Sequence, residues 1–169
     1  MFLKRKPKVK RTVDERGSAA GAEPTQALLQ DEHGLYHLWY LELRLDEELV
    51  RAARTENVFS LVTWQLRLLP GETPGVDLLR RAAAIIIKGV RSYDIPSRID
   101  KERFTALILD ADYEQASTAA FRIKGDLQLQ MPSAGTWRAG VATFRRDGLD
   151  DDALISTALR RLQDDARAA

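Results

Sequence analysis

Two histidines are the residues of this sequence whose type and spacing come closest to a catalytic metal site. His33 and His37 are the only histidines in the chain, and their separation by four positions would place both on one face of a helix. The intervening residues are Gly-Leu-Tyr, so a glutamate base is missing, and no third ligand can be identified. We therefore expect two surface or capping histidines at the start of a helix, and no metal site.

Other chemical signatures are incomplete in the same way. The chain has no cysteine, which excludes disulfides, thiolate metal sites and cysteine nucleophiles, and which fits a reducing compartment. The stretch from Pro70 to Gly75 contains two glycines but lacks the Gly-Lys-Ser/Thr that completes a phosphate-binding loop. The acidic run between Asp147 and Asp152 lacks the alternation of a calcium-binding loop, and helix capping explains it.

Composition indicates one ordinary globular domain, which we place at residues 28–169. The chain has 169 residues, of which 44% are hydrophobic and 30% charged. Its apolar stretches are far too short to cross a bilayer, and its first residues lack the apolar centre of a secretory signal. We therefore expect a cytoplasmic protein.

Residues 1–27 are predicted to be a basic, flexible tail. Six of the 26 basic residues fall within the first eleven positions, where no acidic residue occurs, and the remainder carries 20 basic against 25 acidic residues. Such a tail keeps a protein soluble, and it can also contact an anionic membrane surface or an acidic partner. We predict no specific nucleic acid as its partner.

Changes of periodicity along the domain predict α/β architecture in the order αβαββαβα. Apolar residues recur at three- and four-residue spacing in the predicted helices, and short β-branched and aromatic runs indicate strands. The predicted helices are 36–55, 76–92, 112–125 and a last helix from about 150. The predicted strands are 58–66, 95–99, 104–109 and 136–144.

Several strings within this order resemble the GGDEF family of diguanylate cyclases. Residues 34–41 resemble its opening motif, Ser60-Leu61-Val62 its first core strand, residues 98–109 its signature and following strand, and residues 139–142 its late strand. The resemblance implies a GGDEF or nucleotidyl cyclase-like fold. In that fold a central mixed, largely antiparallel sheet is flanked by helices around a ferredoxin-like palm core.

The same resemblance implies that the metal and substrate positions are degenerate. A cyclase holds metal ions against GTP with carboxylates and lets the nucleotide approach the backbone closely. The metal-binding Asp of the first strand corresponds to Gln65, and the next acidic position to Arg67. The signature itself reads Asp100, Lys101, Glu102, Arg103 and Phe104, so side chains replace its two glycines and one of its acids is an arginine.

The guanine-binding and phosphate-binding positions are altered too. Val76 takes the place of the guanine-binding Asp, unless Asp77 shifts by one, and the phosphate-side Lys falls on Ala166. Losing nearly all of these residues leads us to expect that the chain is not an enzyme. A residual activity that uses Glu102 is the weakest alternative.

One functional feature of the family is retained. Many cyclases have an inhibitory product site, R-x-x-D, placed five residues before the signature, and Arg91 and Asp94 occupy those positions here, with Arg122 in the register of a further arginine. Arginine binds guanine O6 and N7 or phosphate, and a carboxylate takes guanine N–H groups. The alternative is a local salt bridge with a capping role, and an ordinary solvated Arg122.

The sequence therefore predicts a non-catalytic signalling protein without a cofactor. The role that the resemblance implies is that of a cyclic di-GMP receptor, which uses Arg91, Asp94 and Arg122 and acts through a protein partner or a homodimer. The alternative is a structural or scaffolding module with the same fold that binds no nucleotide.

Overall fold

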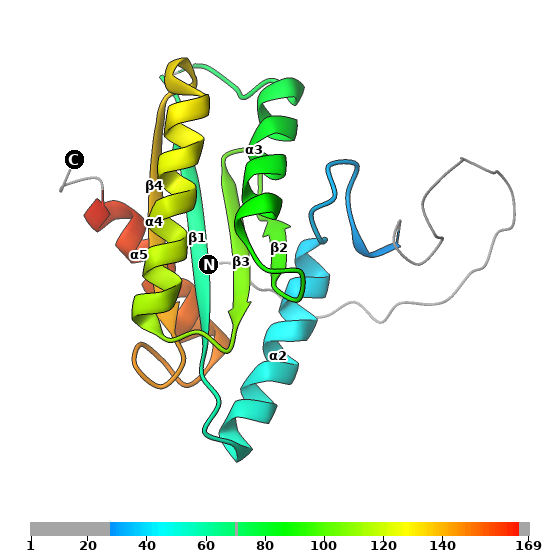
Figure 1. The fold of residues 1–169 in the computed structure, drawn as a ribbon, viewed down its shortest axis with the longest axis vertical. Coiled ribbons are helices and arrows are strands. Elements are labelled where there is room, and N and C mark those ends of the chain that lie inside the picture. Colours follow the sequence, from blue (N-terminus) through cyan, green and yellow to red (C-terminus); the bar gives the residue numbers. More distant parts are fainter. Residues whose placement is uncertain (1–27, 70, 166–169) are drawn as a thin grey trace, which may run out of the picture.

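The computed structural model describes residues 28–69 and 71–165, and its elements follow the predicted order (Figure 1). The predicted tail and Ala166 lie outside the described residues. The helices and strands are α2 (Leu38–Arg54), β1 (Phe59–Arg67), α3 (Val76–Gly89), β2 (Ile95–Arg98), β3 (Arg103–Leu109), α4 (Tyr113–Gln130), β4 (Thr136–Thr143) and α5 (Asp151–Asp165), with a 3-10 turn at Pro132–Ala134.

The strands form one four-stranded sheet in the order β2-β3-β1-β4. Each neighbouring pair is antiparallel, and parallel pairing among the described residues is limited to isolated bridges such as Tyr36 with Ser97. β1 and β2 are joined through α3, and β3 inserts between them, which is the split βαβ arrangement of a ferredoxin-like core. The predicted palm core and its largely antiparallel sheet are confirmed.

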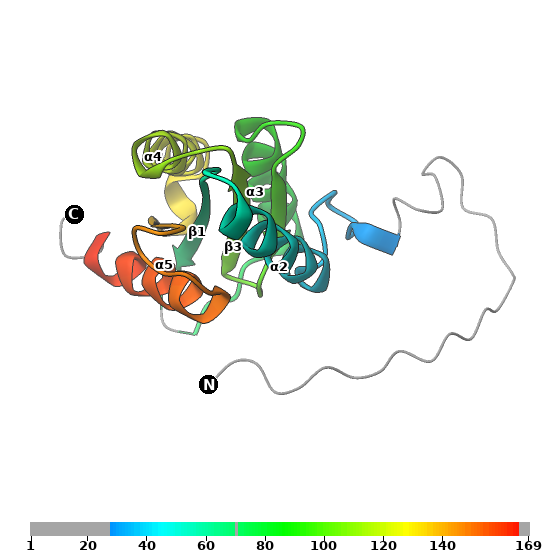
Figure 2. The same cartoon turned by 90° about the horizontal axis from the view of Figure 1, so that it is seen from below.

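Helices cover both faces of the sheet (Figure 2). Alternation along β1 explains this, because successive side chains point to opposite faces. Val62, Trp64 and Leu66 pack into the core beneath α3 and α4, whereas Phe59 and Leu61 pack into the core beneath α2 and α5. The buried indole Nε1 of Trp64 donates to the Ala120 carbonyl oxygen at 3.0 Å and so fixes α4 on the central strand.

Two predicted helix ends were wrong. α4 continues beyond Gly125 to Gln130, because Ile123 and Leu127 extend its buried stripe by one more turn. α3 ends at Gly89 instead of residue 92, and the Val90 N–H closes its last turn on the Ile86 carbonyl.

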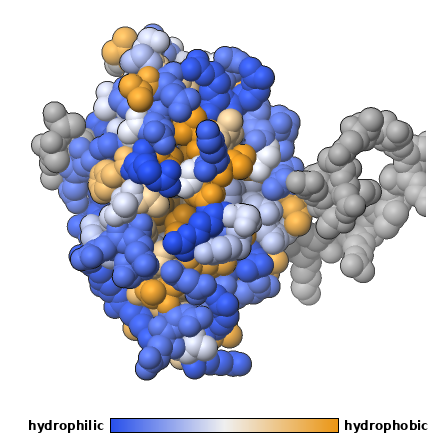
Figure 3. All heavy atoms as spheres, viewed as in Figure 1, coloured by the Kyte–Doolittle hydropathy of each residue, from blue (hydrophilic) through white to orange (hydrophobic). Residues whose placement is uncertain are grey.

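Two arginines, one on each helix, connect α3 and α4. The surface over these helices is partly apolar (Figure 3). Arg81 of α3 donates to the carbonyl of Gln130, the last residue of α4, at 2.6 Å. Arg122 of α4 donates to the carbonyl of Gly89, the last residue of α3, at 2.7 Å. Each guanidinium therefore meets the negative end of the other helix's dipole.

In the described part of the chain, no helix is both long enough and apolar enough to cross a membrane.

Candidate functional site

The loop between α3 and β2 places Asp94 in the protein interior. Asp94 is 3% exposed, and its Oδ2 and Oδ1 accept the backbone N–H groups of Arg91 at 2.8 Å and Leu109 at 3.1 Å. Burial raises the pKa of this carboxyl group, although the two N–H donors and the charge of Arg91 act in the opposite direction. Asp94 therefore closes the Arg91–Asp94 turn and ties it to the end of β3.

The two predicted arginines lie at the surface near this turn. Arg91 Nη1 donates to the Tyr93 hydroxyl at 3.0 Å, and its guanidinium carbon lies 5.8 Å from the centre of the Tyr93 ring. Arg122 donates to the Gly89 carbonyl, where a close approach of the helices brings Gly89 against Ile123. Within the described ranges, neither guanidinium forms an ion pair at 4.0 Å or less with a carboxylate. Among the described residues, the hydrogen-bond acceptors of the two guanidiniums are therefore neutral oxygens.

Arg91, Asp94 and Arg122 line one pocket of about 170 Å³. Its apolar surface comes from Ile108, Ala111 and Ala119, and its remaining lining residues are Gly89, Val90, Gln115 and Thr118. The structure thus brings the three predicted site residues together. The volume is below the roughly 300–1,000 Å³ of pockets that enclose drug-sized ligands, so part of any larger ligand would stay outside.

Gln115, Thr118 and Tyr93 were missed by the sequence reasoning. Gln115 and Thr118 precede Arg122 by seven and four positions on α4, so the helical period places all three on one face. Once Arg122 is taken as a site residue, this spacing identifies Gln115 and Thr118 as its neighbours on the same helix face. Tyr93 carried no comparable signal, because its role depends on the conformation of the loop.

At the other end of β3, Asp100, Lys101 and Glu102 lie in the turn of the β2–β3 hairpin. Asp100 Oδ1 accepts the backbone N–H groups of Glu102 and Arg103 at 2.9 and 2.8 Å, and Oδ2 pairs with the Arg103 guanidinium at 2.6 Å. Burial opposes ionisation of Asp100, but Arg103 and these N–H donors outweigh it, and its pKa lies below the usual value. Asp100 therefore acts as a turn-forming residue. Phe104, which follows Arg103 in the chain, is fully buried against Trp137.

The position that corresponds to a metal ligand is surrounded by positive charge. In the register of the sheet, Gln65 of β1 lies opposite Arg103 of β3 on one side and Arg138 of β4 on the other. Directly opposed side chains have Cβ atoms about 4.5–5.5 Å apart. Within residues 28–69 and 71–165, no three His, Cys, Asp or Glu side chains are grouped closely enough to hold a metal ion. These residues do not fit the divalent cation that a cyclase would use.

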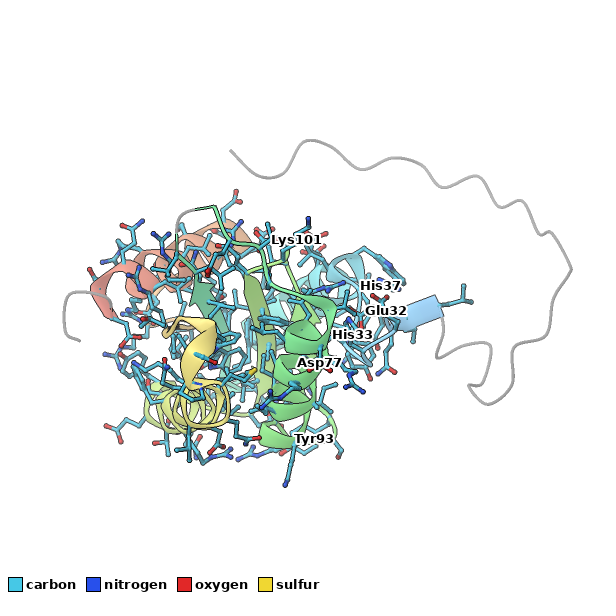
Figure 4. All side chains as sticks on the ribbon, turned by 90° about the horizontal axis from the view of Figure 1, so that it is seen from above. Glu32, His33, His37, Asp77, Tyr93 and Lys101 are labelled. Atoms are coloured by element: carbon cyan, nitrogen blue, oxygen red, sulfur yellow. The ribbon has the colours of Figure 1, made fainter. Side chains whose placement is uncertain are left out.

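A second, more open pocket of about 500 Å³ lies between this hairpin and the start of α3. Thr73, Pro74, Val76 and Leu79 line one side, and Arg98, Ile99, Asp100 and Lys101 line the other. Val76 is exposed and lines this pocket, whereas Asp77 is outside the lining and pairs with Arg80 on its own helix. The first pocket adjoins the end of α3, and Figure 4 shows Tyr93 and Lys101 on opposite sides of the molecule. The two sites are therefore separate.

The two histidines lie close together beside the start of α2 (Figure 4). His37 occupies the N-cap position, as predicted, but its side chain makes no capping hydrogen bond. The prediction of a surface position was wrong for His33, whose side chain is 6% exposed and lies 3.5 Å from Glu32. The turn that Asp31 closes by accepting the N–H groups of His33 and Leu35 explains this burial.

No protein-family model and no curated protein matches the sequence. Solved structures are similar: the GGDEF domain of FimX from Pseudomonas aeruginosa has a TM-score of 0.68 at 21% identity, over 83% of this chain and 95% of that one. The GGDEF domain of DgcB from Caulobacter crescentus, in complex with c-di-GMP, has a TM-score of 0.71 at 13% identity, over 89% and 95%. The diguanylate cyclase SiaD from P. aeruginosa, in complex with its activator SiaC, has a TM-score of 0.72 at 21% identity, over 86% and 60%. This chain has the fold of GGDEF domains.

Proposed function

We propose that this protein is a non-catalytic signalling module that binds cyclic di-GMP at the pocket between α3 and α4. The observation that carries the proposal is the convergence of Arg91, Asp94 and Arg122 on one pocket, with both guanidiniums free of ion pairs to described carboxylates. A similar structure, the GGDEF domain of DgcB, is in complex with c-di-GMP. That ligand offers guanine edges and phosphates, both of which arginine binds bidentately.

The three residues have different roles in this proposal. Arg91 and Arg122 contact the ligand, and each exchanges a single hydrogen bond to a neutral oxygen for bidentate contacts to a guanine edge or a phosphate. Asp94 is buried and already accepts two backbone N–H groups, so it holds the loop that presents Arg91. It is therefore a positioning residue.

The absence of catalysis is part of the same proposal. Its support is the lack of a cation site at Gln65, which is opposed by Arg103 and Arg138, together with the use of Asp100 in a hairpin turn. Incubation with GTP and Mg²⁺, followed by chromatography of the nucleotides, is expected to show no cyclic di-GMP. Metal-dependent turnover would refute this part independently of ligand binding.

Calorimetry with cyclic di-GMP tests the receptor proposal. Losing one hydrogen bond to a charged group costs about 1.5–3 kcal/mol, so we expect Arg91→Ala and Arg122→Ala each to weaken binding by roughly 10- to 100-fold. Arg80→Ala is the matched control, because Arg80 lies on α3 and pairs with Asp77 away from the pocket. Absence of heat with the wild-type protein at high micromolar ligand would refute the proposal, as would equal affinity of all three variants.

A scaffolding module that binds no nucleotide is the second candidate. The observation in its favour is that Arg91, Asp94 and Arg122 all have intramolecular hydrogen-bond partners, so the loop is complete without a ligand. In either case we expect the protein to act through a protein partner or a homodimer. The similar structure of SiaD, which is in complex with its activator SiaC, motivates that expectation.

A further inference from the structure

The face of the sheet opposite the proposed ligand site carries an apolar cleft between α2 and α5. Its volume is about 140 Å³, and β1 and β3 form its floor through Leu61, Thr63 and Thr105. Its walls are mainly aliphatic. The remaining lining residues are Leu38, Leu41 and Glu42 of α2, Ile99 and Arg103 at the hairpin, and Ile155 and Leu159 of α5.

Three acidic groups lie beside this cleft. Burial raises the pKa of Glu42, and the carboxylates of Asp46 and Asp151 raise it further. Asp46 lies four residues after Glu42 at the middle of α2, and Asp151 is the first residue of α5, so both helices contribute acidic groups. In the described part of the chain, none of these three carboxylates forms an ion pair at 4.0 Å or less. The cleft is therefore suited to a segment that combines apolar side chains with several positive charges.

The chain contains such a segment. Phe2 and Leu3 are followed directly by Lys4, Arg5 and Lys6, and no acidic residue occurs in the first eleven positions. Residues 12–27 connect this segment to the described part and would span roughly 50 Å when extended. α2, which is 17 residues long, measures only about 25 Å. Since Leu38 at the start of α2 lines the cleft, the connection is long enough to reach either end of it.

We propose that residues 2–6 of this same chain occupy the cleft, with Phe2 and Leu3 over the aliphatic lining and the basic residues beside Glu42, Asp46 and Asp151. Burying large apolar side chains is favourable, and tethering supplies a millimolar effective concentration, so even a weak contact is populated. The inference concerns a different face from the cyclic di-GMP site and does not depend on it.

Charge favours this occupant over two others. An anionic membrane surface would be repelled by the three carboxylates. A second copy that docked by the same cleft would bring its own acidic residues against them, because a two-fold contact places the same surface on both sides.

Spin-label NMR tests the proposal on the full chain. Because the chain has no cysteine, Thr12→Cys provides a unique position for a nitroxide next to the basic segment. We expect the nitroxide to weaken the amide signals of Leu41, Thr63 and Leu159 in the cleft, and to leave those of α4 on the other face unchanged. Replacing Lys4, Arg5 and Lys6 by glutamate should restore the cleft signals.

The acidic side of the cleft has a matched control. The triple variant Glu42→Lys, Asp46→Lys, Asp151→Lys should also restore the signals, whereas Glu72→Lys, Glu114→Lys, Asp126→Lys, with the same change of charge elsewhere, should not. Cleft signals that are unaffected by the nitroxide, or that stay weak in both charge-reversed proteins, overturn the proposal. Weakening in a mixture of isotope-labelled chains and separate spin-labelled chains also overturns it, because the occupant would then be a second copy.

Discussion

Gly140 of β4 is the position where the packing of α5 on the sheet leaves least room, and its replacement by alanine gives the sharpest test of the fold. A Cβ atom at this position would overlap the carbonyl oxygen of Ala158 and lie 3.0 Å from the amide nitrogen of Leu162. Both atoms belong to the backbone of α5, which cannot rotate away as a side chain could. Gly140→Ala therefore requires the whole helix to move.

The expected cost follows from this geometry. Inserting a methyl group into a well-packed region costs about 1–3 kcal/mol, and contact with a rigid backbone places this change in the upper part of that range. For a domain of 150–250 residues, each kcal/mol lowers Tm by about 2–4 °C. We expect Gly140→Ala to lower the free energy of unfolding by about 2–3 kcal/mol, and Tm by roughly 4–12 °C.

Gly125 is a matched control with the opposite expected sign. It lies within α4, is exposed, and a Cβ atom added there would meet no atom of the described structure within 4 Å. Alanine is favoured over glycine inside a helix by about 0.5–1 kcal/mol. Gly125→Ala should therefore stabilise the protein by that amount.

Urea unfolding followed by far-UV circular dichroism measures both changes in the same buffer. The slope of the unfolding free energy against urea should be equal in the three proteins, so that the midpoints report stability alone. A wild-type midpoint for Gly140→Ala would refute the proposed packing of α5 on β4. A lower midpoint for Gly125→Ala would refute the continuous α4 helix through that position.

Two further predictions concern charges. Asp147 is held by two hydrogen bonds from Arg161, and these and the Thr143 N–H outweigh the effect of burial and keep its pKa below the usual value. Such a carboxylate stabilises the fold above its unfolded pKa of about 3.9, and this contribution is lost as the pH falls through the lower folded value. Asp147→Asn should therefore lower the free energy of unfolding by about 1.5–3 kcal/mol at pH 7. In urea unfolding, the difference between variant and wild type should narrow below about pH 4. A difference that stays constant would contradict the prediction. Gln65→Asp should not create cyclase activity with GTP and Mg²⁺, because Arg103 and Arg138 would hold the new carboxylate; product formation would contradict the proposed loss of the metal site.

The order of helices and strands was predictable because apolar residues recur with a characteristic period within each element. The helix ends were less so, since they depend on tertiary contacts. Gly125 looked like a helix end, yet Leu127, two residues later, is fully buried and keeps α4 packed on the sheet for another turn. Burial of one apolar side chain, worth about 1.5–3 kcal/mol, exceeds the roughly 1 kcal/mol cost of a helical glycine.

The candidate site was predicted by position but not by role. The resemblance to the GGDEF family pointed to Arg91, Asp94 and Arg122 as site residues, and all three line one pocket. The partner of Asp94 that decides its role is the backbone of Leu109, 15 residues further on, and no local pattern reveals that contact. The capping role of Arg122 likewise depends on the close approach of two helices at Gly89.

β3 explains why a changed signature leaves the proposed ligand pocket intact. The Asp100–Arg103 turn ends at the first residue of β3, and Asp94 accepts the backbone N–H of its last residue, Leu109. Six residue steps of strand, about 20 Å, separate these contacts. Between them, β3 is paired with β1 from Arg103 to Leu109 and buried from Phe104 onwards, so a substitution at the hairpin meets a rigid strand before it reaches Asp94. Changes at the hairpin are therefore expected to leave the geometry of the Arg91–Asp94 turn unchanged, and under the proposed function this separation allows a ligand site to exist without a catalytic one.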